Sequence, residues 1–191
     1  PYTTLFRSTL SGANTFSGAF TLDAGALNSN SASALGSGAG IITINGGTID
    51  NTSGAAIIST STKPQVWNAD ISFLGSNSLS MGTGAVTLSG AGTSRSVNVS
   101  ANTFGVGGVN GSGFGLVKTG AGNLTLNGVS NITGLLDIQG GIVGVSEDFF
   151  GDAPIGTGIL QNSGLTGTKW TFWNGDSNIT SGVLIRNNDG T

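Results

Sequence analysis

The sequence predicts an all-β fold, a parallel β-helix (solenoid) of about nine short coils. Three observations support this prediction: many short segments with strand periodicity, glycine-containing turns between them, and a pattern that occurs twice along the chain. An antiparallel sandwich is the alternative for short strands at this spacing, but it would usually need longer strands.

Short strands are the first observation. Apolar and small polar residues alternate with the period of a half-buried strand. The segments that do so are residues 20–22, 42–44, 86–88, 97–99, 124–126 and 136–138. We expect the apolar side chains to fill a thin continuous core and Ser, Thr and Asn to form ladders on the outside.

Turns are the second observation. Residue pairs 46–47, 127–128 and 140–141 contain glycine, which adopts positive φ at little steric cost. A recurring corner, apolar-Gly-hydroxyl-Gly, also precedes new strands. It occurs at residues 35–38, 81–84 and 155–158. Coils that bend at equivalent positions can stack their strands, so a recurring corner favours a solenoid.

Internal repetition is the third observation. A shift of 116 residues places residues 10–27 on residues 126–143, with apolar residues on apolar residues and glycine on glycine. The matched pairs are Leu10 and Leu126, Gly12 and Gly128, Phe16 and Ile132, Gly18 and Gly134, Phe20 and Leu136, Leu22 and Ile138, Gly25 and Gly141, and Leu27 and Val143. We place the two repeat copies near residues 9–50 and 116–160.

The first eight residues are predicted to be foreign to the protein. Residues 1–8 look like the translation of a short-read sequencing adapter, and their Pro, Tyr and Arg are atypical of the rest of the chain. Residues 9–191 are then one β-helix fragment. We expect both ends of the sequence to be breaks in the reads.

Composition narrows the class of protein. The chain has 35 Gly and 3 Pro, is 37% apolar and only 8% charged, and contains neither Cys nor His. It can therefore build a core, while the absence of a Gly-X-Y period and of a long apolar run argues against collagen and a membrane helix. With a net charge of −3 and no Lys/Arg cluster, it is not expected to bind nucleic acid.

Catalysis is not expected. Without His and Cys there is no Ser-His-Asp triad, no Cys-His pair and no imidazole or thiolate metal site. We therefore predict no catalytic, metal or cofactor-binding residues, and the sequence assigns no ligand-binding residue. Glu147, Asp148 and Asp152, beside Phe149 and Phe150, are expected to form a solvated loop; ligand binding and carboxylate catalysis are the open alternatives.

Other candidate sites are expected to be structural. Tryptophans at 67, 170 and 173 are expected to pack against the core rather than to stack on sugars. The glycine-rich residues 105–108 and 111–115 are expected to be turns rather than phosphate loops. Neither residues 45–47 nor 189–190 show the repetition of calcium β-rolls, so no structural calcium is expected.

A family resemblance covers most of residues 9–145. Residues 118–128, 131–134 and 140–143 resemble the passenger-associated repeat of bacterial autotransporters, and residues 10–18 and 34–38 match the same repeat. Segments 66–73, 79–84 and 97–102 are similar to stretches common in these passengers. Departures are Leu135 and Leu136, where small or hydroxyl residues are more usual, the longer segment 146–154, and the poor match of residues 164–191.

The resemblance implies a secreted passenger segment with a right-handed parallel β-helix, exported by type V secretion through the outer membrane of a Gram-negative bacterium. Its role would be structural, a stalk that supports secretion and display at the cell surface. The implied partners are a C-terminal translocator barrel of the same polypeptide, the outer-membrane assembly machinery and the host-cell surface, without nucleic acid or a small-molecule cofactor. The alternatives are an adhesin that binds host glycan or protein directly and part of a β-helical polysaccharide-degrading enzyme.

Overall fold

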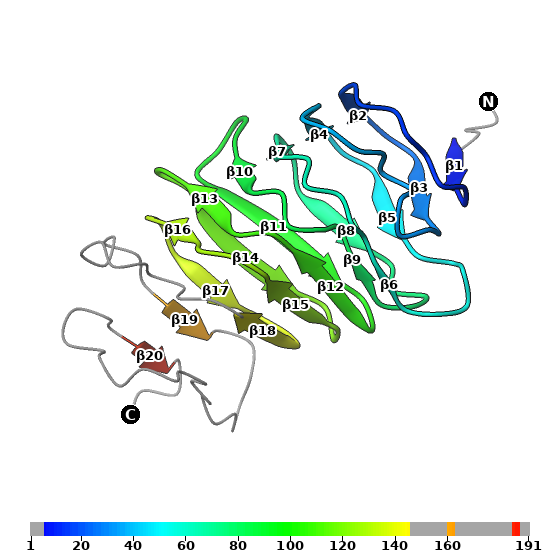
Figure 1. Ribbon diagram of the computed structural model, residues 1–191. Helices are drawn as coiled ribbons and strands as arrows, with labels where there is room; N and C mark the ends of the chain where they lie inside the picture. The colour runs from blue at the N-terminus through cyan, green and yellow to red at the C-terminus, as the bar shows by residue number, and fades with distance from the viewer. Residues whose placement is uncertain (1–5, 146–159, 163–184, 188–191) are drawn as a thin grey trace, which may run out of the picture.

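The computed structural model describes residues 6–145, 160–162 and 185–187 of the 191-residue chain (Figure 1). The described residues form twenty short strands and no helix. In chain order the strands are β1 (Arg7–Leu10), β2 (Phe20–Leu22), β3 (Ala26–Ser29), β4 (Ile42–Ile44), β5 (Thr48–Asp50), β6 (Ile57–Ile58), β7 (Gln65–Trp67), β8 (Ile71–Phe73), β9 (Leu79–Ser80), β10 (Val86–Leu88), β11 (Ser94–Val99), β12 (Thr103–Val106), β13 (Val109–Gly111), β14 (Gly115–Thr119), β15 (Asn123–Leu126), β16 (Asn131–Ile132), β17 (Leu136–Ile138), β18 (Ile142–Val145), β19 (Leu160–Asn162) and β20 (Ile185–Asn187). No helix in this part of the chain is long and apolar enough to cross a membrane.

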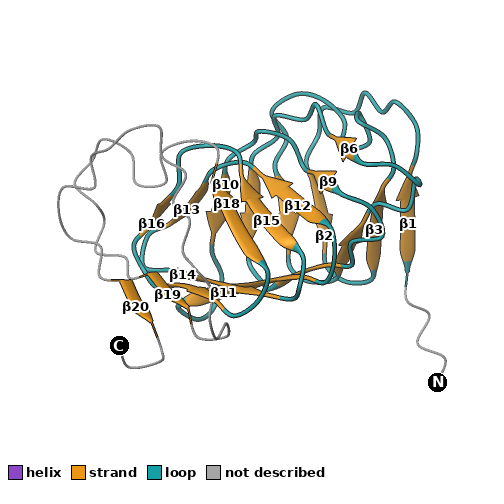
Figure 2. Cartoon of the chain, turned by 90° about the horizontal axis from the view of Figure 1, so that it is seen from below, coloured by secondary structure: helices purple, strands orange, loops and turns teal. Residues whose placement is uncertain are grey.

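Three parallel sheets wind around a common axis (Figures 1 and 2). Sheet A has nine strands, in the order β1-β3-β5-β8-β11-β14-β17-β19-β20. Sheet B has six, in the order β16-β13-β10-β7-β4-β2, and sheet C has five, in the order β18-β15-β12-β9-β6. The result is a β-solenoid of about seven turns, which confirms the predicted fold and lies close to the predicted nine coils. Its right-handed winding stays a prediction.

All six segments with alternating residues are strands. Four of them coincide with β2, β4, β10 and β17, and the other two lie within β11 and β15. In β10, for example, Val86 and Leu88 are buried while Thr87 is exposed. Period-2 alternation therefore identifies the apolar inward positions, although in β17 the intervening Asp137 is buried as well.

The turn prediction is partly confirmed. Gly47 has φ 87° and Gly141 has φ 66°, a conformation that only glycine adopts readily. The prediction of positive φ is wrong for Gly128 and Gly140, where the small size of glycine is needed instead: a Cβ on Gly128 would lie 2.9 Å from the amide nitrogen of Gly108. Glycine at these corners therefore also allows neighbouring coils to approach.

Two of the three recurring corners lie within the described residues, and both precede a new strand as predicted. Gly36, Gly38 and Gly82 all have positive φ, with values of 69°, 91° and 98°. The corner at residues 35–38 comes before β4 and that at residues 81–84 comes before β10, so both turn the chain into sheet B. The third corner, residues 155–158, lies outside the described residues.

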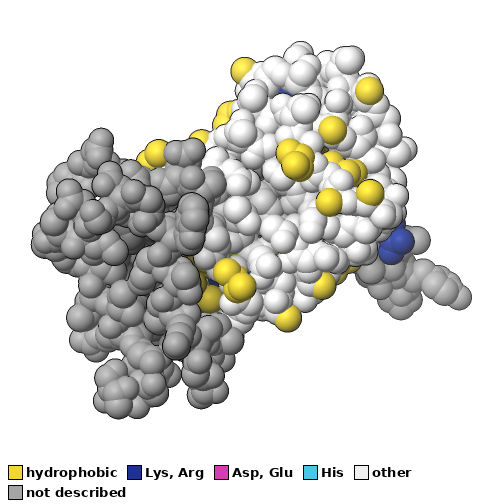
Figure 3. Space-filling model, turned by 60° about the horizontal axis from the view of Figure 1, so that its bottom comes forward, with side chains coloured by type: hydrophobic (Ala, Val, Ile, Leu, Met, Phe, Trp, Pro, Cys, Tyr) yellow, Lys and Arg dark blue, Asp and Glu magenta, His cyan; other side chains and the backbone are white. Residues whose placement is uncertain are grey.

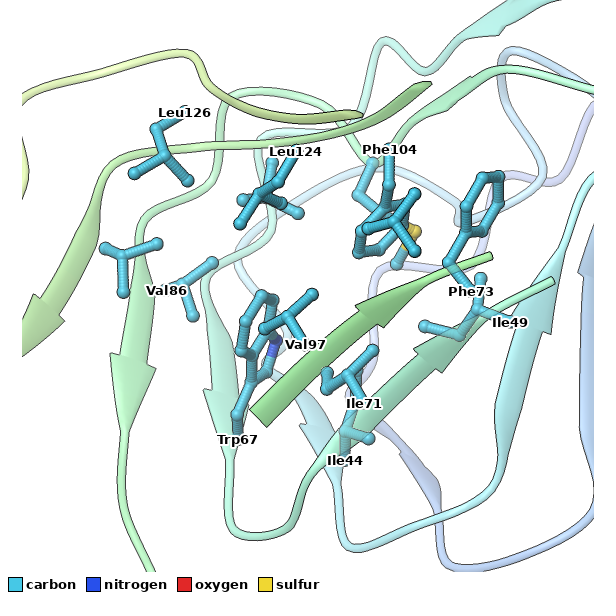
Figure 4. Packing of buried hydrophobic residues seen from close by; sticks show 14 of the residues in the cluster. Ile44, Ile49, Trp67, Ile71, Phe73, Val86, Val97, Phe104, Leu124 and Leu126 are labelled. Carbon is cyan, nitrogen blue, oxygen red and sulfur yellow. The ribbon is translucent and has the colours of Figure 1, made fainter. Parts of the chain in front are cut away.

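The interior of the solenoid is a column of apolar side chains from all three sheets. Figure 4 shows Trp67, Val97 and Leu124 converging on one interior from sheets B, A and C. Phe73 and Phe104 stack with ring centroids 4.7 Å apart and an interplanar angle of 19°. Fully burying side chains of this kind contributes roughly 1.5–3 kcal/mol each, so this column is the main source of stability.

The first turns of the solenoid have only two sheets. Sheets A and B begin at β1 and β2, whereas sheet C begins at β6. The preceding connection between β3 and β4 contains no strand, and hydrogen-bonded turns at residues 31–36 take the chain directly toward sheet B. The N-terminal section is therefore less completely enclosed than the middle of the molecule.

The two repeat copies pair their strands in the same register but lie in different sheets. Leu10 is paired with Ser29, and the equivalent Leu126 is paired with Val145. The first pair lies in sheet A and the second in sheet C. Likewise β2 lies in sheet B, while its equivalent β17 lies in sheet A. Equivalent strands of the two copies therefore lie on different sides of the solenoid, displaced from each other by one corner of the coil. This displacement is the change of corner between the copies.

Arg7 and Ser8 belong to the segment predicted to come from an adapter, and they form the first half of β1. They pair with Ala26 and Leu27. The foreign origin of residues 1–8 and the assignment of residues 9–191 to one fragment stay predictions.

Candidate functional site

Most of the side chains that the sequence offers as candidate sites lie outside the described residues. These are Glu147, Asp148, Phe149, Phe150, Asp152, Trp170, Trp173 and Asp189. Within the described residues there is no group of three or more His, Cys, Asp or Glu placed to hold a metal ion.

Trp67 is fully buried at the end of β7. Its Nε1 donates a hydrogen bond to Oε1 of Gln65 at 3.2 Å, and the ring lies among core side chains (Figure 4). A buried indole presents no face on which a sugar ring could stack. Of the two alternatives weighed for this residue, packing against the core is the one that the structure shows.

The glycine-rich segments 105–108 and 111–115 connect strands of neighbouring sheets. Gly113 has φ 79° and forms a turn, as expected. Gly105, Gly111 and Gly115, by contrast, lie within β12, β13 and β14, so the expectation of a turn is wrong at these positions. The lack of a side chain on Gly105 lets the amide of Asn127 lie close, since a Cβ would be 3.0 Å from Nδ2.

Three buried basic side chains form the most unusual polar feature of the described structure. Lys63, Arg95 and Lys118 are only 1%, 4% and 0% exposed. Charged groups are costly to bury unless they are hydrogen-bonded. The hydrogen bonds found for them among the described residues all end on main-chain carbonyl oxygens.

Lys118 joins two coils of the second repeat copy. Its Nζ donates to the carbonyl oxygens of Thr119 at 2.6 Å, Gly120 at 3.0 Å and Gly140 at 3.0 Å. Gly140 belongs to the following coil, so all three ammonium protons are used only when that coil is in place. Burial lowers the pKa of the Lys118 ammonium to about 8.

Lys63 makes a comparable connection near the N-terminal end. Its Nζ donates to the carbonyl oxygens of Ser17 at 3.0 Å and Gly18 at 2.8 Å, and lies 5.1 Å from the centroid of the Phe16 ring. These partners precede it by 45 to 47 residues. The lysine therefore holds the corner that comes after β1.

Arg95 closes the corner between β10 and β11. Its guanidinium donates to the carbonyl oxygens of Ser89, Ala91 and Ser94, and it lies 5.0 Å from the ring centroid of Phe114. Sequence reasoning missed the role of all three cations. The only available signal was that each stands alone in a long uncharged stretch, which does not tell a buried cation from a solvated one.

The outer surface carries polar ladders, which include exposed carboxylates such as Asp23. Asn45 donates to Oδ1 of Asp23 at 2.7 Å and accepts from Asn68 at 2.8 Å, and these residues follow β4, β2 and β7. The predicted ladders of polar residues are thus present. On the face shown in Figure 3, the described surface is largely uncharged, with separate apolar side chains.

Comparison with known proteins gives a match to one repeat family. Two segments, residues 9–28 and 116–145, match the family of the passenger-associated-transport-repeat. They fall within the two copies predicted from the internal repetition, and the match confirms the resemblance to autotransporter passenger repeats. No curated protein and no solved structure gives a significant match.

Proposed function

We propose that this chain is a structural passenger segment of a bacterial autotransporter, a stalk that supports secretion across the outer membrane and display at the cell surface. The observation that carries the proposal is the combination of two passenger-associated-transport-repeat segments with a continuous parallel solenoid. The chain would remain attached to, or be released from, a translocator barrel encoded in the same polypeptide.

The architecture supports this role because each coil completes the one before it. A folded coil offers a row of strand edges and an open end of the apolar column, and the next coil covers both. In the second copy, β15 pairs with β12 on one side and with β18 on the other. A coil that docks on such a template gains hydrogen bonds and apolar burial, which makes backward movement of the chain unfavourable.

The buried cations would further stabilise the docking of one coil on the next. The cage around Lys118 takes two carbonyls from its own corner and one from the following coil. Docking of residue 140 therefore satisfies an ammonium group that would otherwise keep a free donor. The proposal gives the solenoid no catalytic role and no cofactor.

The test uses the complete protein. We expect the full coding sequence to include about ten-residue segments of alternating apolar residues, the pattern of a membrane β-barrel. In a Gram-negative host, protease added to intact cells should then cleave the passenger. A deletion of residues 116–145 should lower this surface signal several-fold while the barrel remains in the outer membrane.

A conservative substitution at the surface serves as the control for this measurement. Thr87→Ser changes an exposed side chain of sheet B and should leave the surface signal unchanged. Equal display of the deletion variant and the full protein would contradict a role of the repeat in secretion. A coding sequence without any barrel segments would leave the solenoid but remove the autotransporter role.

A further inference from the structure

Four Asn-Gly pairs occur in the chain, and asparagine before glycine is especially open to spontaneous deamidation. Glycine carries no side chain that hinders attack of its own amide nitrogen on the preceding asparagine, and its backbone rotates easily. Residues 45–46, 110–111 and 127–128 lie within the described structure, and residues 174–175 lie outside it. The surroundings of each described pair decide how readily it can react.

The first pair lies in the turn between β4 and β5. The amides of Asn45 and Thr48 donate to the carbonyls of Leu22 and Gly25 at 2.8 Å each. Between these two anchored residues, the amide of Gly46 donates no hydrogen bond to any described residue. Asn45 is exposed, so water can reach its side-chain amide.

The other two described pairs are held more firmly. Gly111 lies within β13 and is paired with Ile132, and this pairing keeps the main chain extended. Asn127 is half-buried, and Gly128 packs so closely on the neighbouring coil that a Cβ would lie 2.9 Å from the amide nitrogen of Gly108. Rotation toward ring closure would disturb the strand in one case and the contact between coils in the other.

We propose that Asn45 is a site of spontaneous deamidation, which converts it to a mixture of aspartate and isoaspartate. The amide nitrogen of Gly46 gives up its proton and attacks Cγ of Asn45, and Nδ2 takes up a proton and leaves as ammonia. Water then opens the five-membered succinimide. Attack on the side-chain carbonyl gives aspartate, and attack on the main-chain carbonyl gives isoaspartate.

The modification changes the polar ladder formed by Asp23, Asn45 and Asn68. Nδ2 of Asn45 donates to Oδ1 of Asp23 at 2.7 Å, and Oδ1 of Asn45 accepts from Asn68 at 2.8 Å. Both bonds are exposed and weak enough to open without unfolding of the chain. In the aspartate product two carboxylates face each other where a donor and an acceptor stood, which disfavours the charged form of both. Deamidation therefore breaks the bond between the coils of β2 and β4 and keeps an acceptor for Asn68.

Peptide mapping of the aged chain by mass spectrometry tests the proposal. The folded chain is kept at neutral pH below its melting temperature and then digested. The peptide with Asn45 should gain the mass of an amide-to-carboxyl change several-fold faster than the peptide with Asn110, and should contain both aspartate and isoaspartate. Asn110 is a matched internal control, because both asparagines follow a β-branched residue, Ile44 or Val109.

Two controls separate the effect of the fold from that of the local sequence. In concentrated urea the rates at residues 45 and 110 should become similar, because neither pair is then held by the fold. Asn45→Gln keeps an amide but would need a six-membered ring for the same reaction, so the peptide with residue 45 should stay unmodified. Equal rates at 45 and 110 in the folded chain would overturn the proposal. So would faster conversion at 127, or a product at 45 without isoaspartate.

The consequence for the ladder has its own test. Asn45→Asp reproduces one product, and it should melt at a lower temperature than the parent chain. In an Asp23→Ala background the same substitution should lower the melting temperature less, because the facing carboxylate is absent. Equal losses in the two backgrounds would contradict repulsion between residues 23 and 45 as the effect of the modification.

Discussion

The two repeat copies share a sequence pattern and a strand register, yet they occupy different corners of the solenoid. Gly25 of the first copy lies in the connection from sheet B to sheet A, whereas the equivalent Gly141 lies in the connection from sheet A to sheet C. Both have positive φ, 85° and 66°, and at both a Cβ would lie within 2.2 Å of a carbonyl oxygen of another coil. The repeat therefore specifies a corner and the pairing around it, rather than one particular sheet.

The copies differ in how completely they are covered. At Gly18 of the first copy a Cβ would meet nothing within 4 Å, whereas at the equivalent Gly134 it would lie 2.5 Å from the amide nitrogen of Gly115. Gly134 follows a described coil, whereas Gly18 lies in the first coil that the structure describes, so the difference reflects the position of each glycine along the solenoid. Equal sequence thus gives equal local geometry but unequal packing.

The largest expected loss of stability is for a residue in the fully enclosed part of the core, and it can be compared with the loss for a residue in the less enclosed N-terminal section. Phe104→Ala removes a fully buried ring stacked on Phe73 and should lower the free energy of unfolding by about 3–5 kcal/mol. Phe20→Ala, at a half-buried ring beside Phe16, should cost only about 1–2 kcal/mol. Urea unfolding of both variants checks this. Equal losses would contradict an open N-terminal section.

A glycine pair tests the difference in covering directly. Gly134→Ala places a methyl group against the backbone of Gly115 and should destabilise the fold by about 1–3 kcal/mol. Gly18→Ala should leave the melting temperature nearly unchanged, because its surroundings are open. If both variants melt alike, the first copy must be as closely covered as the second.

The lysine that links the second copy to its next coil gives a pH-dependent prediction. Lys118→Met leaves three carbonyl oxygens without their donor and should cost about 1–2 kcal/mol near pH 7. Burial lowers the pKa of Lys118 from 10.5 to about 8. Between these values the unfolded chain holds a proton that the folded chain has released, so the free energy of unfolding should rise with pH.

The methionine variant is also the control for this pH dependence. It lacks the titrating group, so its free energy of unfolding should rise less between pH 8 and pH 10.5 than that of the parent chain. Parallel pH profiles of the two proteins in urea unfolding would show that Lys118 does not titrate in this range.

The smallest effect is expected at the surface ladder beside the first copy. Asn45→Ala removes hydrogen bonds to Asp23 and Asn68, which are at least partly solvated, and should cost about 0.5–1 kcal/mol. Asn110→Ala, at an exposed position of β13, is the matched control and should cost less. Thermal melts of both variants would decide whether the ladder contributes at all.

Short-range pattern predicts much of this fold, because strand alternation and glycine corners are local properties. Residues 20–22 and 136–138 are recognisable as strands, but their alternation is identical in sheet B and sheet A, so the sequence does not reveal the change of corner. Gly128 and Gly140 are expected to adopt positive φ. They instead allow the backbone of the neighbouring coil to approach closely, and this requirement depends on residues distant in the sequence.

The polar interior is less predictable. In the sequence Lys63, Arg95 and Lys118 are isolated charges, and only the coiling of the chain shows that each donates to a carbonyl of another coil, that of Gly18, Trp67 and Gly140 respectively. Their burial is a property of stacked coils, so no local pattern encodes it. Trp67, in contrast, is expected to pack because single aromatic residues in strands usually do.

The most direct test of the change of corner is thiol cross-linking, since the chain has no cysteine of its own. Thr21 faces outward from β2 and is paired with Thr43 of β4 in sheet B. A short bis-maleimide should therefore link Thr21→Cys to Thr43→Cys rapidly, and should not link Thr21→Cys to Thr48→Cys of sheet A. The reverse result, with position 21 linked to position 48, would place both repeat copies in the same sheets and contradict the change of corner.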